Sequence, residues 1–173
     1  MESLIEFGKI LLPAALVLYA MYLGVKVMVA KELAQKQMEI RQKSIEITLP
    51  ARLQAYERMS LFLERISANN LVLRVNQTGM GAREFHELLL QEIRNEYNHN
   101  VSQQVYMSED VWQEIKAAKE ELIIGINAAS EGLEDEASSL DLAKKLFDFM
   151  MNKDVDPIDN ALKSLKAEIS KTY

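Results

Sequence analysis

The chain has 173 residues, no cysteine, two histidines, and 20 Lys and Arg against 26 Asp and Glu, which gives a net charge of −6. This length fits one domain of ordinary size. The acidic balance excludes a strongly basic nucleic-acid-binding protein as the default class. Because the chain has no cysteine, disulfide scaffolds, thiolate zinc sites, iron–sulfur clusters and catalytic thiols are excluded as well.

The strongest pattern is an apolar run near the N-terminus. Residues 10–25 carry no charge, and apolar residues extend the run to 4–30, interrupted by Glu6, Lys9 and Lys26. A helix of this length spans about 40 Å, which is enough to cross a bilayer in a tilted orientation. The lysines near its ends can extend their ammonium groups to the membrane–water interface. A helix at the edge of a soluble protein would show a polar face, and a cleaved signal peptide would show a small-residue cleavage site. We therefore predict a transmembrane anchor over residues 1–30.

The distribution of basic residues predicts the orientation of this anchor. Lys9 precedes the uncharged run, whereas five Lys and Arg follow it within residues 26–43. Since the basic flank stays in the cytoplasm, we expect the N-terminus outside and residues 31–173 inside. Ala20 and Gly24 lie four residues apart and form a candidate membrane-helix interface, because small residues let helices approach closely in lipid. We expect that interface to contact other membrane-protein subunits, with a homo-oligomer as the open alternative.

Residues 31–49 are predicted to continue the helix as a stalk, because good helix formers follow one another without a breaker. Apolar residues recur here every seven positions, at Leu33, Ile40 and Ile47. Gln37 and Ser44 occupy the alternate positions, which makes the row too weak for a self-paired coiled coil. The segment is therefore a solvated stalk or a helix held by a partner. Pro50 is expected to end it and to start the next helix.

Apolar residues spaced three and four apart predict amphipathic helices over residues 50–68, 82–99 and 108–130, which pack as a helical bundle over 50–130. Ser108 is the expected N-cap of the third helix. Residues 71–75 fit either a short strand or a helical turn. Residues 131–139 form an acidic linker, and 140–173 a C-terminal helical pair (140–152 and 157–171) that packs on the bundle or on a partner. The predicted fold class is all-α.

No residue is predicted to be catalytic, to bind a cofactor or to bind a metal. Glu96 and His99 have the spacing of a di-iron ligand pair, but the second such motif is missing, and a helix C-terminal cap is the ordinary role of His99. Gly79 and Gly81 follow residues 71–75 in a loop that lacks the third glycine and the second strand of a dinucleotide site. An enzyme built from carboxylates and arginines is the competing class.

Four residues of the bundle are candidate partner contacts. Arg52, Arg58 and Arg65 lie beside the apolar stripe of the first bundle helix, where guanidinium groups could bind carboxylates of a partner. The alternative is pairing with glutamates of their own helix. Trp112 is the single tryptophan, and a place in the core is its expected role, with a partner contact as the alternative.

Residues 52–66 and 99–108 carry a resemblance to a family. In these segments, RLQAYERMSLFLERI and HNVSQQVYMS, the chain resembles a family of bacterial single-span membrane proteins with a helical cytoplasmic part and no assigned activity. The resemblance covers residues 1–130. It implies the bacterial inner membrane, and it carries over no functional residue.

These patterns together predict a non-enzymatic membrane-anchored subunit or scaffold. It presents a cytoplasmic helical interaction domain and belongs to a larger membrane-protein assembly, with the lipid bilayer and other membrane subunits as partners, without nucleic acid and without a cofactor. The alternative is a membrane-tethered regulator that binds a soluble partner through its acidic C-terminal helices. Residues 101–173 hold 15 Asp and Glu against 8 Lys and Arg, so this end of the chain is acidic.

Overall fold

The fold is helical throughout the part of the chain that the structure describes. The computed structural model describes residues 2–153 and 155–172, without the side chains of 2–5, 8, 10 and 172. Within these residues there is no strand, only an isolated bridge between Gly81 and Ser138, which confirms the all-α class. The elements are α1 (Glu2–Ile66), α2 (Ala68–Val75), α3 (Ala82–Asn100), the 3₁₀ helix η1 (Val101–Tyr106), α4 (Glu109–Ser130), α5 (Ser139–Met151) and α6 (Pro157–Thr172).

Helix α1 runs through Pro50, so the prediction that this proline ends the stalk and starts a new helix is wrong. Proline removes one backbone hydrogen bond from a helix and normally costs about 3 kcal/mol or more. Here good helix formers precede Pro50, and the residues that follow it, such as Ala55 and Met59, are buried. Propensity on one side and packing on the other therefore hold the helix together across the proline. The helix ends at Ile66, two residues before its predicted end.

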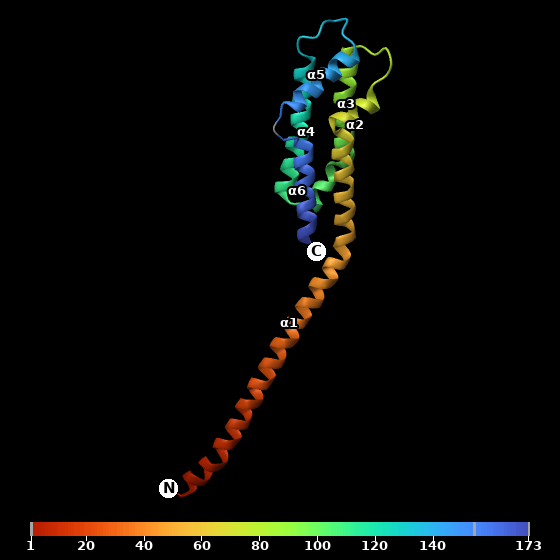
Figure 1. The fold of residues 1–173 in the computed structure, drawn as a ribbon. Helices are drawn as coiled ribbons and strands as arrows, with labels where there is room; N and C mark the ends of the chain where they lie inside the picture. Colours follow the sequence, from red (N-terminus) through yellow and green to blue (C-terminus); the bar gives the residue numbers. More distant parts are fainter. Residues whose placement is uncertain (1, 154, 173) are drawn as a thin grey trace. The chain divides into compact units, whose positions relative to one another are not determined.

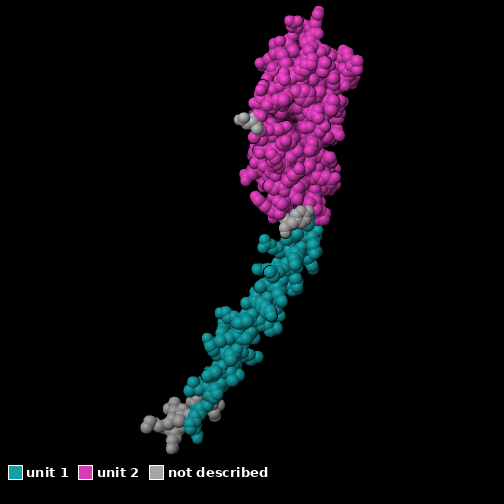
Figure 2. Space-filling model, viewed as in Figure 1, with its two compact units in different colours: residues 1–49 teal, residues 50–173 magenta. Residues whose placement is uncertain are grey.

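The chain divides into two compact units, residues 1–49 and 50–173, coloured teal and magenta in Figure 2. In the first unit, the described side chains between Glu6 and Thr48 are all exposed. Helix α1 contains an 18-residue apolar window, near the N-terminus, of which no part is buried. It is the one helix, among the residues the structure places, that is long and apolar enough to cross a membrane.

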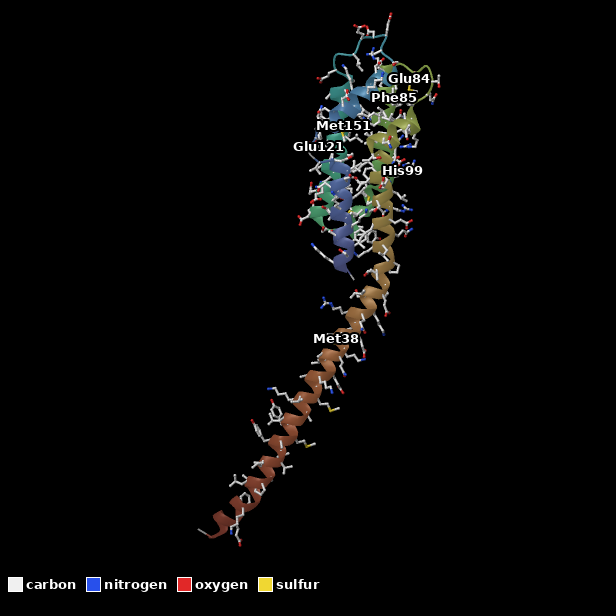
Figure 3. The ribbon with its side chains drawn as sticks, viewed as in Figure 1. Met38, Glu84, Phe85, His99, Glu121 and Met151 are labelled. Carbon is white, nitrogen blue, oxygen red and sulfur yellow. The ribbon has the colours of Figure 1, made fainter. Side chains whose placement is uncertain are left out.

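The second unit builds one apolar core from all of its α-helices. Helix α4 packs against α3, α5 and α6, and the C-terminal part of α1 shares their core (Figure 1). Phe85 points from α3 into this core (Figure 3). The largest fully buried side chains are Tyr56, Phe62, Phe85, Met59, Leu63, Ile66, Leu71, Leu89, Ile93, Ile115, Leu122 and Ile126. Because such residues recur every three or four positions, each helix turns one face inward.

The C-terminal helices belong to this core. Leu142 and Leu146 of α5 and Leu165 of α6 are fully buried, and both helices pack against α4. Of the two arrangements open from the sequence, packing on the bundle is the one the structure adopts. Gly125 of α4 allows the close approach of α5, because a Cβ at this position would lie 3.0 Å from Cδ1 of Phe149.

The helix ends are held by specific caps and turns. The Ser108 hydroxyl accepts a hydrogen bond from the Val111 amide at 3.4 Å, which confirms the predicted cap of α4. Helix α5 begins with a capping box between Ser138 and Asp141, which the sequence analysis missed. The predicted linker 131–139 is fastened at its end, since the Ala82 amide donates to the Ala137 carbonyl at 2.8 Å and the Ser139 amide to the Met80 carbonyl at 3.0 Å.

Candidate functional site

The most connected polar cluster of the second unit is centred on Glu168 of α6; we call it the Glu168 network. Tyr56 of α1 donates its hydroxyl to Oε1 of Glu168 at 2.8 Å, and the Ser108 amide donates to the two carboxylate oxygens at 3.0 and 3.2 Å. The Ser108 hydroxyl also donates to Oε2 of Glu168 while it accepts from Val111. The network thus joins α6 to α1 and to the start of α4.

Arg52 completes the Glu168 network. Its Nη2 donates to the Tyr56 hydroxyl at 2.7 Å and lies 3.8 Å from Oε1 of Glu168, and its Nε donates to the Tyr106 carbonyl at 3.2 Å. Arg52 was a candidate contact for a partner carboxylate. The structure shows that it faces Glu168, a carboxylate of its own chain on another helix, and not a glutamate of its own helix. A contact of Arg52 with a partner stays a prediction.

Hydrogen bonding fixes the charge state of the Glu168 network. Burial acts to raise the pKa of the Glu168 carboxyl, but the hydrogen bonds from Ser108 and Tyr56 outweigh it, so the pKa lies below the ordinary glutamate value. Burial, and then the hydrogen bond to Glu168, raise the pKa of the Tyr56 phenol. An ionised carboxylate that accepts this many hydrogen bonds is a weak base, and the arrangement acts chemically as a clamp between helices.

Replacing Glu168 tests this clamp. Glu168→Gln puts an amide donor where the Ser108 amide also donates, and we expect a loss of about 1–3 kcal/mol in the free energy of unfolding at neutral pH. Because the folded pKa of Glu168 is lowered, its contribution is present above the unfolded glutamate pKa and is lost as the pH falls through the folded value. The difference between the two chains should therefore shrink on acidification. Urea unfolding of the full chain in detergent, followed by Trp112 fluorescence, measures it.

The control is Glu57→Gln, because Glu57 is exposed on the same helix α1 as Tyr56. We expect this variant to change the unfolding free energy by no more than about 0.5 kcal/mol. A Glu168→Gln difference that stays constant between neutral and acidic pH would show that the ionised carboxylate is not what holds the clamp.

Arg65 lies in a second polar cluster, between α1, α2 and α3. Its Nη2 lies 2.6 Å from Oε1 of Glu96, and its Nε donates to the same oxygen at 2.7 Å. Arg74 of α2 pairs with Glu92 and lies 3.8 Å from Glu96. Within the chain, the carboxylate that pairs with Arg65 therefore belongs to α3 and not to its own helix. A contact of Arg65 with another protein stays a prediction.

Arg58 differs from Arg52 and Arg65, because it forms no hydrogen bond or ion pair with the residues that the structure describes. It is exposed and lines an open hollow of about 560 Å³ together with Gln54, Ser102, Gln103 and Tyr106. Its guanidinium is therefore available for a partner.

Trp112 lies in the core, 4% exposed, where its ring stacks on Tyr97 at a centroid distance of 5.9 Å. The expected core role is confirmed. The alternative, that Trp112 contacts a partner, is not supported, because its side chain is almost fully buried.

Ala20 and Gly24 are exposed on α1, and a Cβ at Gly24 would meet no atom within 4 Å. The surroundings of Gly24 within the chain are therefore open. The proposed contact of these two residues with another membrane helix stays a prediction.

The two motifs weighed for chemistry have local roles in the structure. Residues 71–75 belong to helix α2, which settles the choice between strand and helix, and Gly79 adopts a positive φ of 84° in the turn that follows. Glu96 is engaged by Arg65 and Arg74, and Nδ1 of His99 lies 2.9 Å from the Asn95 carbonyl, one turn back in α3. Within residues 2–153 and 155–172, no group of three His, Cys, Asp or Glu is placed to hold a metal ion.

The sequence analysis missed Tyr56 and Glu168 as polar partners. They lie 112 positions apart, and each sits in an ordinary amphipathic helix pattern. Ser108 was recognised as a cap, but its second role as a donor to Glu168 depends on the position of α6, which no local pattern encodes.

The comparisons with known proteins give a family and no activity. The family model of DUF7935, a family of unknown function, matches residues 2–172, and the chain belongs to that family. The match includes the C-terminal helices, beyond residues 1–130 that the resemblance covers. No curated protein and no solved structure matches the chain.

Proposed function

We propose that this member of DUF7935 is a non-enzymatic, membrane-anchored subunit or scaffold. The apolar part of α1 crosses the bilayer with the N-terminus outside, and residues 50–173 form a helical interaction domain in the cytoplasm. The family resemblance implies the bacterial inner membrane. The chain would work as part of a larger membrane-protein assembly.

The observation that carries this proposal is the exposure of the apolar window of α1. Large apolar side chains such as Leu16, Tyr19 and Tyr22 are each at least 60% exposed. A contiguous apolar surface of this kind indicates contact with a membrane or with other proteins. Charge supports the orientation, because one Lys precedes the uncharged run and five Lys and Arg follow it within residues 26–43.

The polar clusters of the second unit support an interaction role for the protein over a catalytic one. Glu168, Arg52, Arg65 and Glu96 pair across helices of the bundle, which leaves them to stabilise the fold. The alternative is a regulator that binds a soluble partner through the acidic C-terminal helices. Such a regulator would offer its partner less apolar surface than the apolar window of α1 offers. Most apolar residues of α5 and α6 are buried in the core, so such a partner would meet their polar faces and a few exposed apolar side chains such as Leu140 and Met151.

The variant Gly24→Leu tests whether the span also recognises another membrane helix. Since a side chain at Gly24 meets nothing within 4 Å in its own chain, its effect falls on contacts with other molecules. We expect the native complex to dissociate on blue-native electrophoresis while Trp112 fluorescence keeps its folded spectrum. The control is Ala15→Leu, because Ala15 is also small and exposed and lies nine positions away, on the opposite face of the helix. An intact Gly24→Leu complex would show that the span is an anchor alone.

A further inference from the structure

The stalk carries an uncovered row of large apolar side chains. Leu33, Ile40 and Ile47 recur every seven residues on one face of α1 and are 60%, 67% and 77% exposed. We call this row, with Gln37 and Ser44 beside it, the 33–47 seam. Removing a leucine or isoleucine side chain from water is favourable, so the seam gains stability when a second helix covers it.

The charges that flank the 33–47 seam are all basic. With the apolar row at heptad position d, Gln37 and Ser44 fall at a, Lys36 and Lys43 at g, and Arg41 at e. The glutamates of this segment fall at position c, outside the flanks, at Glu32, Glu39 and Glu46. A helix that packs on the seam therefore meets positive charge at both of its edges.

The lysines of this flank are free to turn toward a partner. Lys36 Nζ lies 3.0 Å from a carboxylate oxygen of Glu39, but the two side chains are 73% and 55% exposed. Exposed pairs of this kind contribute little, because water screens them and the long side chains lose freedom. Leaving Glu39 thus costs Lys36 little.

Flanking charge disfavours a second copy of this chain as the partner on the seam. In a parallel pair, position g faces the e position of the next heptad, so Lys36 would face Arg41 of the other copy. In an antiparallel pair, g faces g and e faces e, which again sets lysine against lysine and arginine against arginine. Like charges at these positions disfavour pairing in either orientation.

We infer that the 33–47 seam docks an amphipathic helix of another protein that carries Leu or Ile at its core positions and Glu or Asp at its flanks. This inference rests on the proposed function, since it names the chemistry of a partner for the anchored chain. The acidic flanks meet Lys36, Arg41 and Lys43. Gln37 and Ser44 place polar groups within the seam. Polar residues at such positions fix the register of the two helices and lower the strength of their pairing.

Two synthetic peptides of about three heptads each test the inference. Both carry Ile and Leu at a and d, and they differ in having Glu or Lys at every e and g. The full chain is reconstituted in phosphatidylcholine nanodiscs, with empty nanodiscs as the blank, and binding is followed by fluorescence anisotropy of labelled peptide. We expect the Glu peptide to bind at least about tenfold more tightly than the Lys peptide.

Matched variants locate the binding on the seam. Ile40→Gln should weaken binding of the Glu peptide by about tenfold or more. Ile45→Gln makes the same change at an exposed isoleucine off the seam and should leave binding unchanged. Met38→Gln should leave binding unchanged as well, because Met38 (labelled in Figure 3) lies seven positions before Ile45 and therefore on the same face of α1. The triple variant Lys36→Glu, Arg41→Glu, Lys43→Glu should reverse the preference toward the Lys peptide.

Three results would overturn the inference: equal binding of the two peptides, no binding of either, or self-association of the full chain that Ile40→Gln abolishes. None of them concerns membrane insertion, which is measured separately by the incorporation of the chain into nanodiscs. Failure of the docking surface is thus distinguishable from failure of the membrane anchor.

Discussion

A chain that ends at Ser139 should lose the cooperative fold of the remaining bundle. The missing helices α5 and α6 bury seven apolar side chains, Leu142, Ala143, Leu146, Ile158, Ala161, Leu162 and Leu165. Burial of each large one contributes about 1.5–3 kcal/mol, and their sum rivals the total stability of about 5–15 kcal/mol of an ordinary domain. The truncation also removes Glu168 and exposes the face of α4 against which both helices pack.

Tryptophan fluorescence reports this loss at one place in the core, because Trp112 is the single tryptophan and is buried. In the truncated chain we expect emission shifted to longer wavelength and a urea transition without a cooperative step. The control ends at Ser170, which keeps Leu165 and Glu168. A truncated chain that keeps the folded emission spectrum and loses a binding partner would favour the regulator, because its C-terminal helices would then be an accessory to a bundle that folds alone.

Leu122→Ala should destabilise the fold by about 2–5 kcal/mol, the cost of an unfilled cavity left by a buried leucine. Leu122 lies in the centre of α4, is fully buried, and belongs to the cluster that all the bundle helices share. Urea unfolding of the full chain in detergent measures the change in the free energy of unfolding.

Leu73→Ala makes the same substitution at a leucine of α2 that is 72% exposed. It should change stability by no more than about 0.5 kcal/mol, since no cavity forms at the surface. Similar losses in the two variants would contradict the assignment of the core to the inner faces of these helices.

The helices of the bundle could be predicted because their patterns are local. The expected helix over 82–99 is α3, Ala82–Asn100, and the one over 108–130 is α4, with Ser108 as its cap. Apolar spacing and a capping side chain are encoded within a few residues of one another, so they can be recognised before any tertiary contact is known.

Features that depend on distant parts of the chain could not be predicted in this way. Pro50 lies inside α1 because packing beyond it outweighs a local preference to stop. The Glu168 network needs α1, α4 and α6 in place at once. The helical state of residues 71–75 depends on the burial of Leu71 and Val72 against the bundle, which a short apolar run shared by strands and helices does not reveal.

Labelling of single cysteines in intact cells tests the membrane anchor, the central claim, most directly. The chain has no cysteine of its own, so Glu6→Cys and Ser170→Cys each introduce a single thiol at an exposed position. With a maleimide that does not cross membranes, we predict that Glu6→Cys is labelled in intact bacterial cells and Ser170→Cys only after permeabilisation. Both variants should stay in the membrane fraction after alkaline carbonate. Release of the protein by carbonate, or labelling of Ser170→Cys in intact cells, would contradict the account.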